Sequence, residues 1–137
     1  MTLLASDFGK VAVLMGGLSA ERDVSLQGGQ AVLEALVRRG VDAHDVDAGR
    51  DVLSLLQQEG YERVFVMLHG RGGEDGVIQG ALETLGLPYT GSGVAGSALG
   101  TDKFRCKLLR QGLGLPTAPF VMLGREAARA QLRQLGC

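Results

Sequence analysis

Several features that mark specialised classes of protein are scarce in this 137-residue sequence. There are two cysteines, Cys106 and Cys137, and no second pair at metal-ligand spacing, so we expect reduced thiols and neither a disulfide framework nor a zinc site. The net charge is −1 and aromatic residues make up 4%, which argues against a nucleic-acid partner. No apolar run is long enough to cross a bilayer, and the N-terminus lacks the blocks of a signal peptide, so we expect a cytoplasmic protein without a membrane partner.

Common nucleotide and nucleophile motifs are also missing. The sequence contains no G-x-x-x-x-G-K-[ST], which excludes a P-loop. Residues 91–93 (GSG) follow too weak a strand to act as a dinucleotide fingerprint, and there is no serine elbow.

What the sequence does contain is an alternation of apolar runs of strand length with segments of helical periodicity. This alternation is typical of successive βαβ units, and therefore of an α/β domain with a mainly parallel sheet flanked by helices in three layers, a Rossmann-like fold. The 22 glycines and 45% hydrophobic residues suit a globular chain of about one domain with many tight turns. The predicted strands are 10–15, 41–46 and 63–68, with an extended piece at 88–90, and the predicted helices are 23–39, 52–59, 76–85 and 101–111.

The texture of the sequence changes near its end. The small residues 91–100 predict a tight connection without regular structure, and residues 115–119 (LPTAP) read as a linker. A strand-like piece at 120–123 and a helix at 125–135 follow. We therefore expect a first domain over 1–117 and the beginning of a second over 118–137.

Two glycine-rich loops that carry titratable residues follow two of the predicted strands. Residues 69–76 (HGRGGEDG) come after the apolar run 64–68, and residues 16–22 (GGLSAER) come after 11–15. Ligands of open parallel sheets bind outside the carboxyl ends of the strands, where glycine lets them approach the backbone closely. The two loops therefore predict one site at one edge of the sheet.

Each candidate residue in this region also has an ordinary structural explanation. Glu21 suits the first turn of a helix, where the dipole favours a carboxylate by about 0.3–1 kcal/mol, or it pairs with a ligand ammonium. His69 suits a structural histidine as well as a catalytic one. Glu74 and Asp75 suit turn and helix-capping roles, and Lys103 suits an exposed helical position.

Three stretches of the sequence together carry a family resemblance. They are residues 16–25 (GGLSAERDVS), residues 69–80 (HGRGGEDGVIQG), and residues 88–93 (PYTGSG) running into 101–103 (TDK). In this order they resemble the N-terminal part of the D-alanine–D-alanine ligases, ATP-grasp enzymes of bacterial cell-wall synthesis, from Lys10 onward. The resemblance implies that residues 1–117 form a substrate-binding pre-ATP-grasp domain and that 118–137 begin the central ATP-grasp domain.

The resemblance also implies a reaction. ATP, with Mg²⁺, phosphorylates the carboxylate of one D-alanine, and the amine of a second D-alanine displaces phosphate from the acyl phosphate. Family members are longer than this chain, so we expect these 137 residues alone to be inactive, and the full-length protein to form a homodimer.

Residue roles follow from the matching motifs. Glu21 would be the catalytic carboxylate that orients the ammonium of the first D-alanine, Val24 would contact the substrate methyl, and His69 would lie near the substrate carboxylate. Lys103 would reach the ATP phosphates. Two further residues would shape the pocket without chemistry of their own: Ser25 and Gly70.

Two alternatives remain open from the sequence. The same N-terminal residues suit a ligase of this family that forms a D-alanyl ester. A protein of another class, a stand-alone module that binds an amino acid without turning it over, also has these features.

Overall fold

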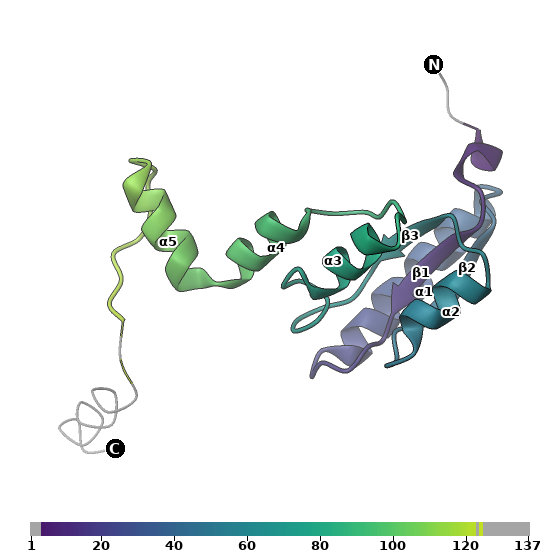
Figure 1. The fold of residues 1–137 in the computed structure, drawn as a ribbon, viewed down its shortest axis with the longest axis horizontal. Coiled ribbons are helices and arrows are strands. Elements are labelled where there is room, and N and C mark those ends of the chain that lie inside the picture. Colours follow the sequence, from purple (N-terminus) through teal and green to yellow (C-terminus); the bar gives the residue numbers. More distant parts are fainter. Residues whose placement is uncertain (1–3, 123, 125–137) are drawn as a thin grey trace. The chain divides into compact units, whose positions relative to one another are not determined.

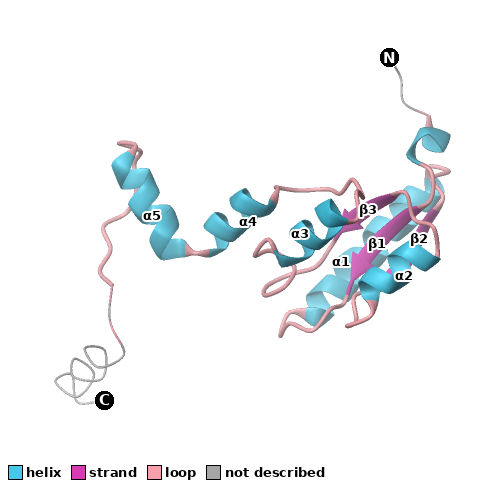
Figure 2. Ribbon diagram, in the orientation of Figure 1, coloured by secondary structure: helices cyan, strands magenta, loops and turns pink. Residues whose placement is uncertain are grey.

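The computed structural model of the protein describes residues 4–122 and 124. Within these residues the central element is a parallel sheet of three strands in the order β2-β1-β3 (Figures 1 and 2). The strands are β1 (Val11–Met15), β2 (Ala43–Asp47) and β3 (Arg63–Val66). β1 pairs with both neighbours and is buried along its whole length, as its unbroken apolar run predicts for a strand covered on both faces.

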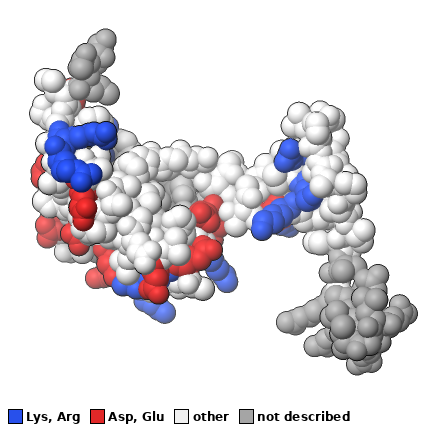
Figure 3. Space-filling view, turned by 180° about the vertical axis from the view of Figure 1, so that it is seen from behind, with Lys and Arg blue, Asp and Glu red and all other residues white. Residues whose placement is uncertain are grey.

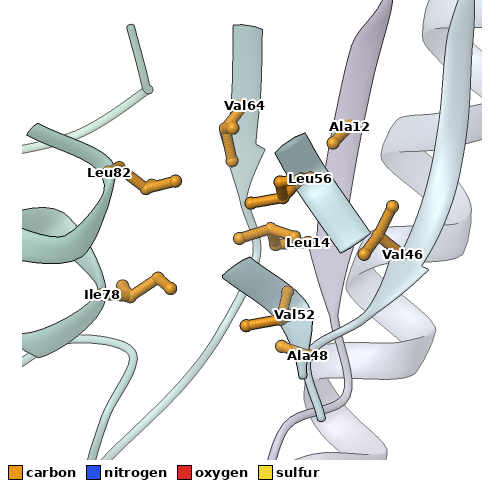
Figure 4. Packing of buried hydrophobic residues seen from close by; sticks show 9 residues of the cluster. All are labelled: Ala12, Leu14, Val46, Ala48, Val52, Leu56, Val64, Ile78 and Leu82. Carbon is orange, nitrogen blue, oxygen red and sulfur yellow. The ribbon is translucent and has the colours of Figure 1, made fainter. Parts of the chain in front are cut away.

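Helices cover both faces of this sheet. The helix α1 (Arg22–Arg38) packs on one face, and α2 (Val52–Gln58) and α3 (Val77–Thr84) pack on the other (Figure 1). The side chains between the sheet and the α2–α3 layer form one buried cluster that includes Leu14 and Leu56 (Figure 4). This arrangement confirms the predicted three-layer α/β fold with a Rossmann-like sheet.

Glycine closures end the helices at the amino edge of the sheet. Gly40, with φ of 80°, donates its N–H to Val37 O, and the next N–H donates to Leu36 O. These two bonds make a Schellman motif, and a glycine with positive φ closes α2 and α3 in the same way at Gly60 and Gly86. Each closure sends the chain back toward the next extended segment through a short connection.

Small differences from the predicted boundaries occur at the ends of elements. β3 ends at Val66, two residues earlier than predicted, although Met67 N still donates to Leu14 O at 2.8 Å. The predicted extended piece at 88–90 is present and forms a parallel bridge between Tyr89 and β3. A 3-10 turn, η1 (Ala5–Phe8), precedes β1 and has no counterpart among the predicted elements.

The prediction for residues 91–100 is wrong, because the structure contains a helix there, α4 (Val94–Thr101). Its glycines and serine have low helix propensity, which is why the sequence reads as a connection. Tertiary contacts override that propensity: a Cβ on Gly76 would lie 2.8 Å from Val94 O, and Thr101 Oγ1 donates to Glu74 O at 2.8 Å. The helix is therefore held against the loop that precedes α3.

The described residues divide into two compact units between Thr101 and Asp102. The second unit contains α5 (Lys103–Gly112), which Asp102 caps by accepting a hydrogen bond from Arg105 N at 2.9 Å. Residues 120–122 have no regular structure, so the strand-like piece predicted there is not found. The predicted helix 125–135 lies outside the described residues, and the domain boundary at 117/118 stays a prediction.

None of the described helices combines the length and the apolar character that a bilayer crossing requires. α1, with 17 residues, carries charges at both ends and within its length.

We expect Leu14→Ala to lower the free energy of unfolding by about 2–5 kcal/mol, because Leu14 is fully buried in the central strand and truncation leaves a cavity. Thermal or denaturant unfolding measures this change. Leu18→Ala is the control, since Leu18 is 75% exposed and its truncation leaves no cavity. Equal loss of stability in the two variants would contradict the packing described here.

Candidate functional site

The strand order places a topological switch point between β1 and β3. The chain passes from β1 to β2 on one side and then crosses to β3 on the other, so the loops after β1 and β3 begin side by side at the carboxyl edge and continue in opposite directions. An open crevice of about 650 Å³ lies between these loops. Residues 18–21 line it from the first loop, and residues 70–72, Asp75 and Val77 line it from the second. This is the position at which open parallel sheets bind ligands, and the two predicted loops do meet there.

Glu21 is the carboxylate of this crevice that its surroundings leave free. It precedes α1 as the N-cap residue, yet its side chain caps no backbone N–H. A Cβ added to Gly70 would lie 2.8 Å from Glu21 Oε2, so the carboxylate rests directly against the Gly70 backbone. No residue in the described ranges donates a hydrogen bond to this carboxylate, and its charge is available to a cationic ligand group.

The acidic residues of the second loop are used differently. Glu74 Oε2 accepts the N–H of Gly70 at 3.0 Å, and Asp75 accepts the N–H groups of Gly72 at 2.9 Å and of Val77 at 3.2 Å. The bond from Gly72 is the largest cause that lowers the pKa of Asp75. These bonds support the turn and capping roles weighed for Glu74 and Asp75. They also occupy amide donors that a phosphate would otherwise need.

A buried glutamine fixes the same loop from beneath. Gln79, on α3, is 5% exposed, and its Nε2 donates to Gly73 O at 2.8 Å. A Cβ on Gly73 would lie 2.5 Å from Leu68 Cβ, so the loop backbone packs directly on the end of the β3 segment. The loop is therefore held by its own carboxylates and by α3.

Arg22 and Asp47 join the first loop to the end of β2. Arg22 Nη1 and Nη2 donate to the two carboxylate oxygens of Asp47 at 2.7 and 2.5 Å. Arg22 Nη1 also donates to Gly17 O at 3.1 Å, and Gly17 N donates to Asp47 Oδ1 at 3.3 Å. The hydrogen bond from Arg22 holds the pKa of Asp47 below its usual value, and the same bond raises the pKa of Arg22.

The remaining predicted substrate residues of this unit occupy different positions. Ser25 is fully buried, and its hydroxyl donates to Met67 O at 2.7 Å, which ties the first turn of α1 to the segment after β3. Val24 is 59% exposed. His69 lines a second hollow of about 260 Å³ beside the crevice, with Nδ1 3.5 Å from Glu74 Oε1. The structure thus brings Glu21 and Gly70 into one crevice and His69 beside it, whereas Val24 and Ser25 line neither hollow.

Lys103 belongs to the second unit, at the start of α5. This helix carries basic side chains and no acidic ones (Figure 3). Arg105 pairs with Asp102, Lys107 Nζ donates to Ala118 O at 3.1 Å, and Arg110 donates to Pro116 O at 2.8 Å. Lys103 makes no hydrogen bond or ion pair with the described residues, so its ammonium group is available to an anion.

In the part of the chain that the structure describes, no group of three His, Cys, Asp or Glu residues is placed to hold an ion. In the view of Figure 3 the first unit carries both acidic and basic side chains, and the acidic ones gather along its lower part. The described side chains that line the crevice thus include the free carboxylate of Glu21 and the guanidinium of Arg71.

The sequence is similar to known proteins of one family. A family model described as the D-ala D-ala ligase N-terminus matches residues 51–92. A D-alanine–D-alanine ligase of Nitrosococcus oceani is 60% identical over 119 residues, and that of Alkalilimnicola ehrlichii is 59% identical over 128 residues. The chain corresponds to the N-terminal region of the D-alanine–D-alanine ligases.

Solved structures agree with this assignment. A D-alanine–D-alanine ligase of Bacillus anthracis, complexed with ATP, matches 85% of this chain with a TM-score of 0.75 and 29% identity. One from Aeromonas hydrophila matches 85% of it with a TM-score of 0.76 and 28% identity. These matches cover 41% and 51% of the two solved chains. The two curated relatives are matched over 87% and 93% of this chain but over 38% and 40% of their own length, so the chain spans about two fifths of them.

Two structural details beside the crevice could not be predicted from the sequence: the Asp47–Arg22 pair and the bond from Gln79 to Gly73 O. Asp47 follows the predicted second strand directly, so the strand-end rule that drew attention to His69 applied to it as well. Its pairing with Arg22 depends on strand order, which the sequence pattern does not fix. Gln79 lies within the matching stretch 69–80, but nothing in the pattern shows that its amide reaches Gly73 O.

We expect Gly73→Ala to destabilise this ligase region by about 1–3 kcal/mol, because the new methyl would have to displace Leu68 or the loop backbone. Thermal unfolding measures the change. Gly100→Ala is the matched control: Gly100 lies in α4 with open space around it, so alanine there should be neutral or stabilising by up to about 1 kcal/mol. A Gly73→Ala variant as stable as Gly100→Ala would refute the close packing of the loop.

We expect the pKa of Asp75 to lie below the ordinary value of about 4, because the folded loop donates hydrogen bonds to its charged form. The contribution of Asp75 to stability is then complete above about pH 4 and is lost as the pH falls through the lowered pKa. Titration of the carboxyl carbon by NMR measures this pKa, and Asp75→Asn identifies the signal. A midpoint at or above 4 would show that the loop does not hold Asp75 in this way.

Proposed function

We propose that this chain is the part of an ATP-dependent D-alanine–D-alanine ligase that receives the first D-alanine. The observation that carries the proposal is the free carboxylate of Glu21, which rests against Gly70 in the switch-point crevice. In the proposed complex this carboxylate pairs with the ammonium group of the amino acid. A charge-assisted hydrogen bond of this kind is among the stronger contacts that a partly exposed site offers.

The satisfied amides of the two loops support an ammonium ligand over a phosphate in the crevice. Gly17, Gly70 and Gly72 each donate their N–H to an acidic side chain of this chain. A phosphate site at a glycine-rich loop depends on such N–H groups being free. These loop amides are therefore not available to a phosphate, and the free carboxylate of Glu21 favours an ammonium group; the side chain of Arg71 also lines the crevice.

The other predicted substrate residues have separate proposed roles, although Val24 and Ser25 line neither the crevice nor the hollow beside it. We propose that His69, beside the crevice, lies near the substrate carboxylate and that the exposed Val24 side chain contacts the substrate methyl. Gly70 lets the ligand approach the backbone closely. Ser25 shapes the site indirectly, because its hydroxyl holds Met67 O and with it the segment that leads to His69.

ATP is the proposed second reactant, and one described residue fits it. Lys103 has a free ammonium group on a basic helix, which suits a contact to a phosphate oxygen and the neutralisation of its charge. When bound, ATP supplies the phosphoryl group that activates the first carboxylate for attack by a second amine. The resemblance also implies Mg²⁺. Within the described ranges no three His, Cys, Asp or Glu residues are placed to hold an ion, so we assign no ligand to Mg²⁺.

The contribution of these residues to the reaction is positional. Glu21 fixes the ammonium end of the first amino acid, so its carboxylate is presented in a constant orientation. Holding a reactant in this way lowers the activation barrier, because the translational and rotational entropy has already been lost on binding. A D-alanyl-ester ligase would bind and activate the first D-alanine in the same way.

Three further expectations stay predictions: the homodimer, the cytoplasmic location and the domain boundary at 117/118.

The proposal is tested by D-alanine-dependent phosphate release from ATP, with the protein expressed from its full reading frame. Glu21→Gln removes the charge at nearly constant shape, and we expect kcat/KM for D-alanine to fall about 10- to 150-fold, as for the loss of a charged hydrogen bond. Glu34→Gln, an exposed glutamate further along α1, is the control and should behave as wild type.

Three further results separate the alternatives. L-alanine should not replace D-alanine as the first substrate, and D-lactate, which lacks the ammonium group, should not bind at Glu21. Ester formation with D-lactate as the second substrate would favour the ester-forming ligase. D-alanine binding without phosphate release in a folded full-length protein would favour the binding module and contradict the ligase.

A further inference from the structure

We propose that Arg22 and Asp47 are a positioning pair for the reaction: they hold the turn at Gly16 and Gly17, and through it the start of α1, so that Glu21 faces Gly70. The expected effect on the kinetics rests on the proposed function, because it requires that D-alanine binds at Glu21. Its structural part concerns only the placement of Glu21 and is tested separately below.

The pair binds both polar backbone groups of Gly17. Arg22 Nη1 donates to Gly17 O at 3.1 Å, while Gly17 N donates to Asp47 Oδ1 at 3.3 Å. The two side chains are also joined to each other through both carboxylate oxygens, at 2.7 and 2.5 Å. A planar guanidinium that bonds a carboxylate at two points fixes direction as well as distance. The peptide groups of Gly17 are therefore tied to the end of β2 in one orientation.

Gly16 shows how closely the pair lies against the backbone. A Cβ at this position would come within 2.4 Å of Asp47 Oδ1 and 2.6 Å of Arg22 Nη1. Its φ of 74° also favours glycine. The space that a side chain would fill at Gly16 is occupied by the ion pair, so turn and pair fit each other.

Glu21 lies between this anchor and a second one. Arg22 is its neighbour in sequence, and Arg22 N donates to Ser19 O at 3.3 Å, which closes the turn that contains Glu21. Ser25, one helical turn later, donates to Met67 O at 2.7 Å. The start of α1 is thus fastened to β2 by Arg22 and to the segment after β3 by Ser25, and the Glu21 side chain projects from between them.

The solvent exposure of Arg22 and Asp47 indicates that the pair positions Glu21 and contributes little to the stability of the whole fold. The side chains of Arg22 and Asp47 are 43% and 52% exposed, and exposed ion pairs contribute little to global stability. Neither residue lines the crevice or the hollow beside it, so neither is placed to touch the amino acid. The expected effect of breaking the pair is therefore local: Glu21 moves while the fold persists.

The kinetic test compares Arg22→Met, Asp47→Asn and the double variant in the full-length protein. We expect KM for D-alanine to rise by on the order of 10- to 100-fold, as a displacement of about 1 Å in a positioning group can produce, with KM for ATP and the melting temperature close to wild type. The double variant should be no worse than the worse single variant, because both changes break one unit. Arg22→Lys keeps the charge but not the fork, so it should restore KM only in part.

Arg63→Met is the matched control. Arg63 also ties backbone carbonyls, with Nε donating to Phe8 O at 3.0 Å and Nη2 to Asp7 O at 3.3 Å, but it lies at the amino end of β3. It should leave KM for D-alanine unchanged. Unchanged KM in Arg22→Met and Asp47→Asn would overturn the proposal. So would a parallel fall in melting temperature and in all kinetic parameters, which indicates a merely structural role.

An NMR measurement keeps the inference separate from the proposed function. In Arg22→Met and Asp47→Asn, the amide signals of Gly17, Glu21 and Gly70 should shift, whereas Arg63→Met should leave them in place. If wild type shows no D-alanine-dependent turnover, the ligase proposal fails, and the positioning of Glu21 still stands or falls on these shifts. Unshifted Glu21 and Gly70 signals would overturn it whatever the enzyme does.

Discussion

Parallel pairing of β1 with a neighbour on each side is the constraint on which the rest of the structure depends. It requires helices on both faces, because a strand bonded along both edges and apolar throughout must be covered above and below. Because the chain passes from β1 to β2 on one side and then to β3 on the other, the loops after β1 and β3 continue to opposite sides, and the crevice lies between them. The parallel order of the three strands therefore accounts for both the two-sided core and the position of the crevice.

Much of the fold was accessible from the sequence because its signals are local. Apolar runs at 11–15 and 64–68 predict β1 and β3, and glycines at the ends of periodic segments predict the closures of the helices. α4 was missed because its signal is not local: its residues have poor helix propensity, and contacts from Val94 and Thr101 to the loop before α3 hold it. The strand-like piece predicted after Pro119 fails for a related reason, since apolar residues such as Phe120 form a strand only where a neighbouring strand pairs with them.

The candidate site was predictable in place but not in detail. Strand-end loops rich in glycine indicated where Glu21 and Gly70 meet, and the structure brings them together. The sequence presents Glu21, Glu74 and Asp75 as equivalent acidic residues near glycines. Only their hydrogen bonds separate a carboxylate that is free from two that are spent on the backbone of their own loop. Such a distinction depends on distances of a few ångströms between segments far apart in sequence.

The internal bonding of residues 70–75 has a consequence for the thermodynamics of binding. A flexible glycine loop that orders only around its ligand loses conformational entropy at that moment, and the loss weakens affinity. Here Glu74, Asp75 and Gln79 restrain the loop through bonds within the chain itself. A loop held in this way is preorganised, so a ligand that binds against it should lose less conformational entropy than one whose binding has to order the loop.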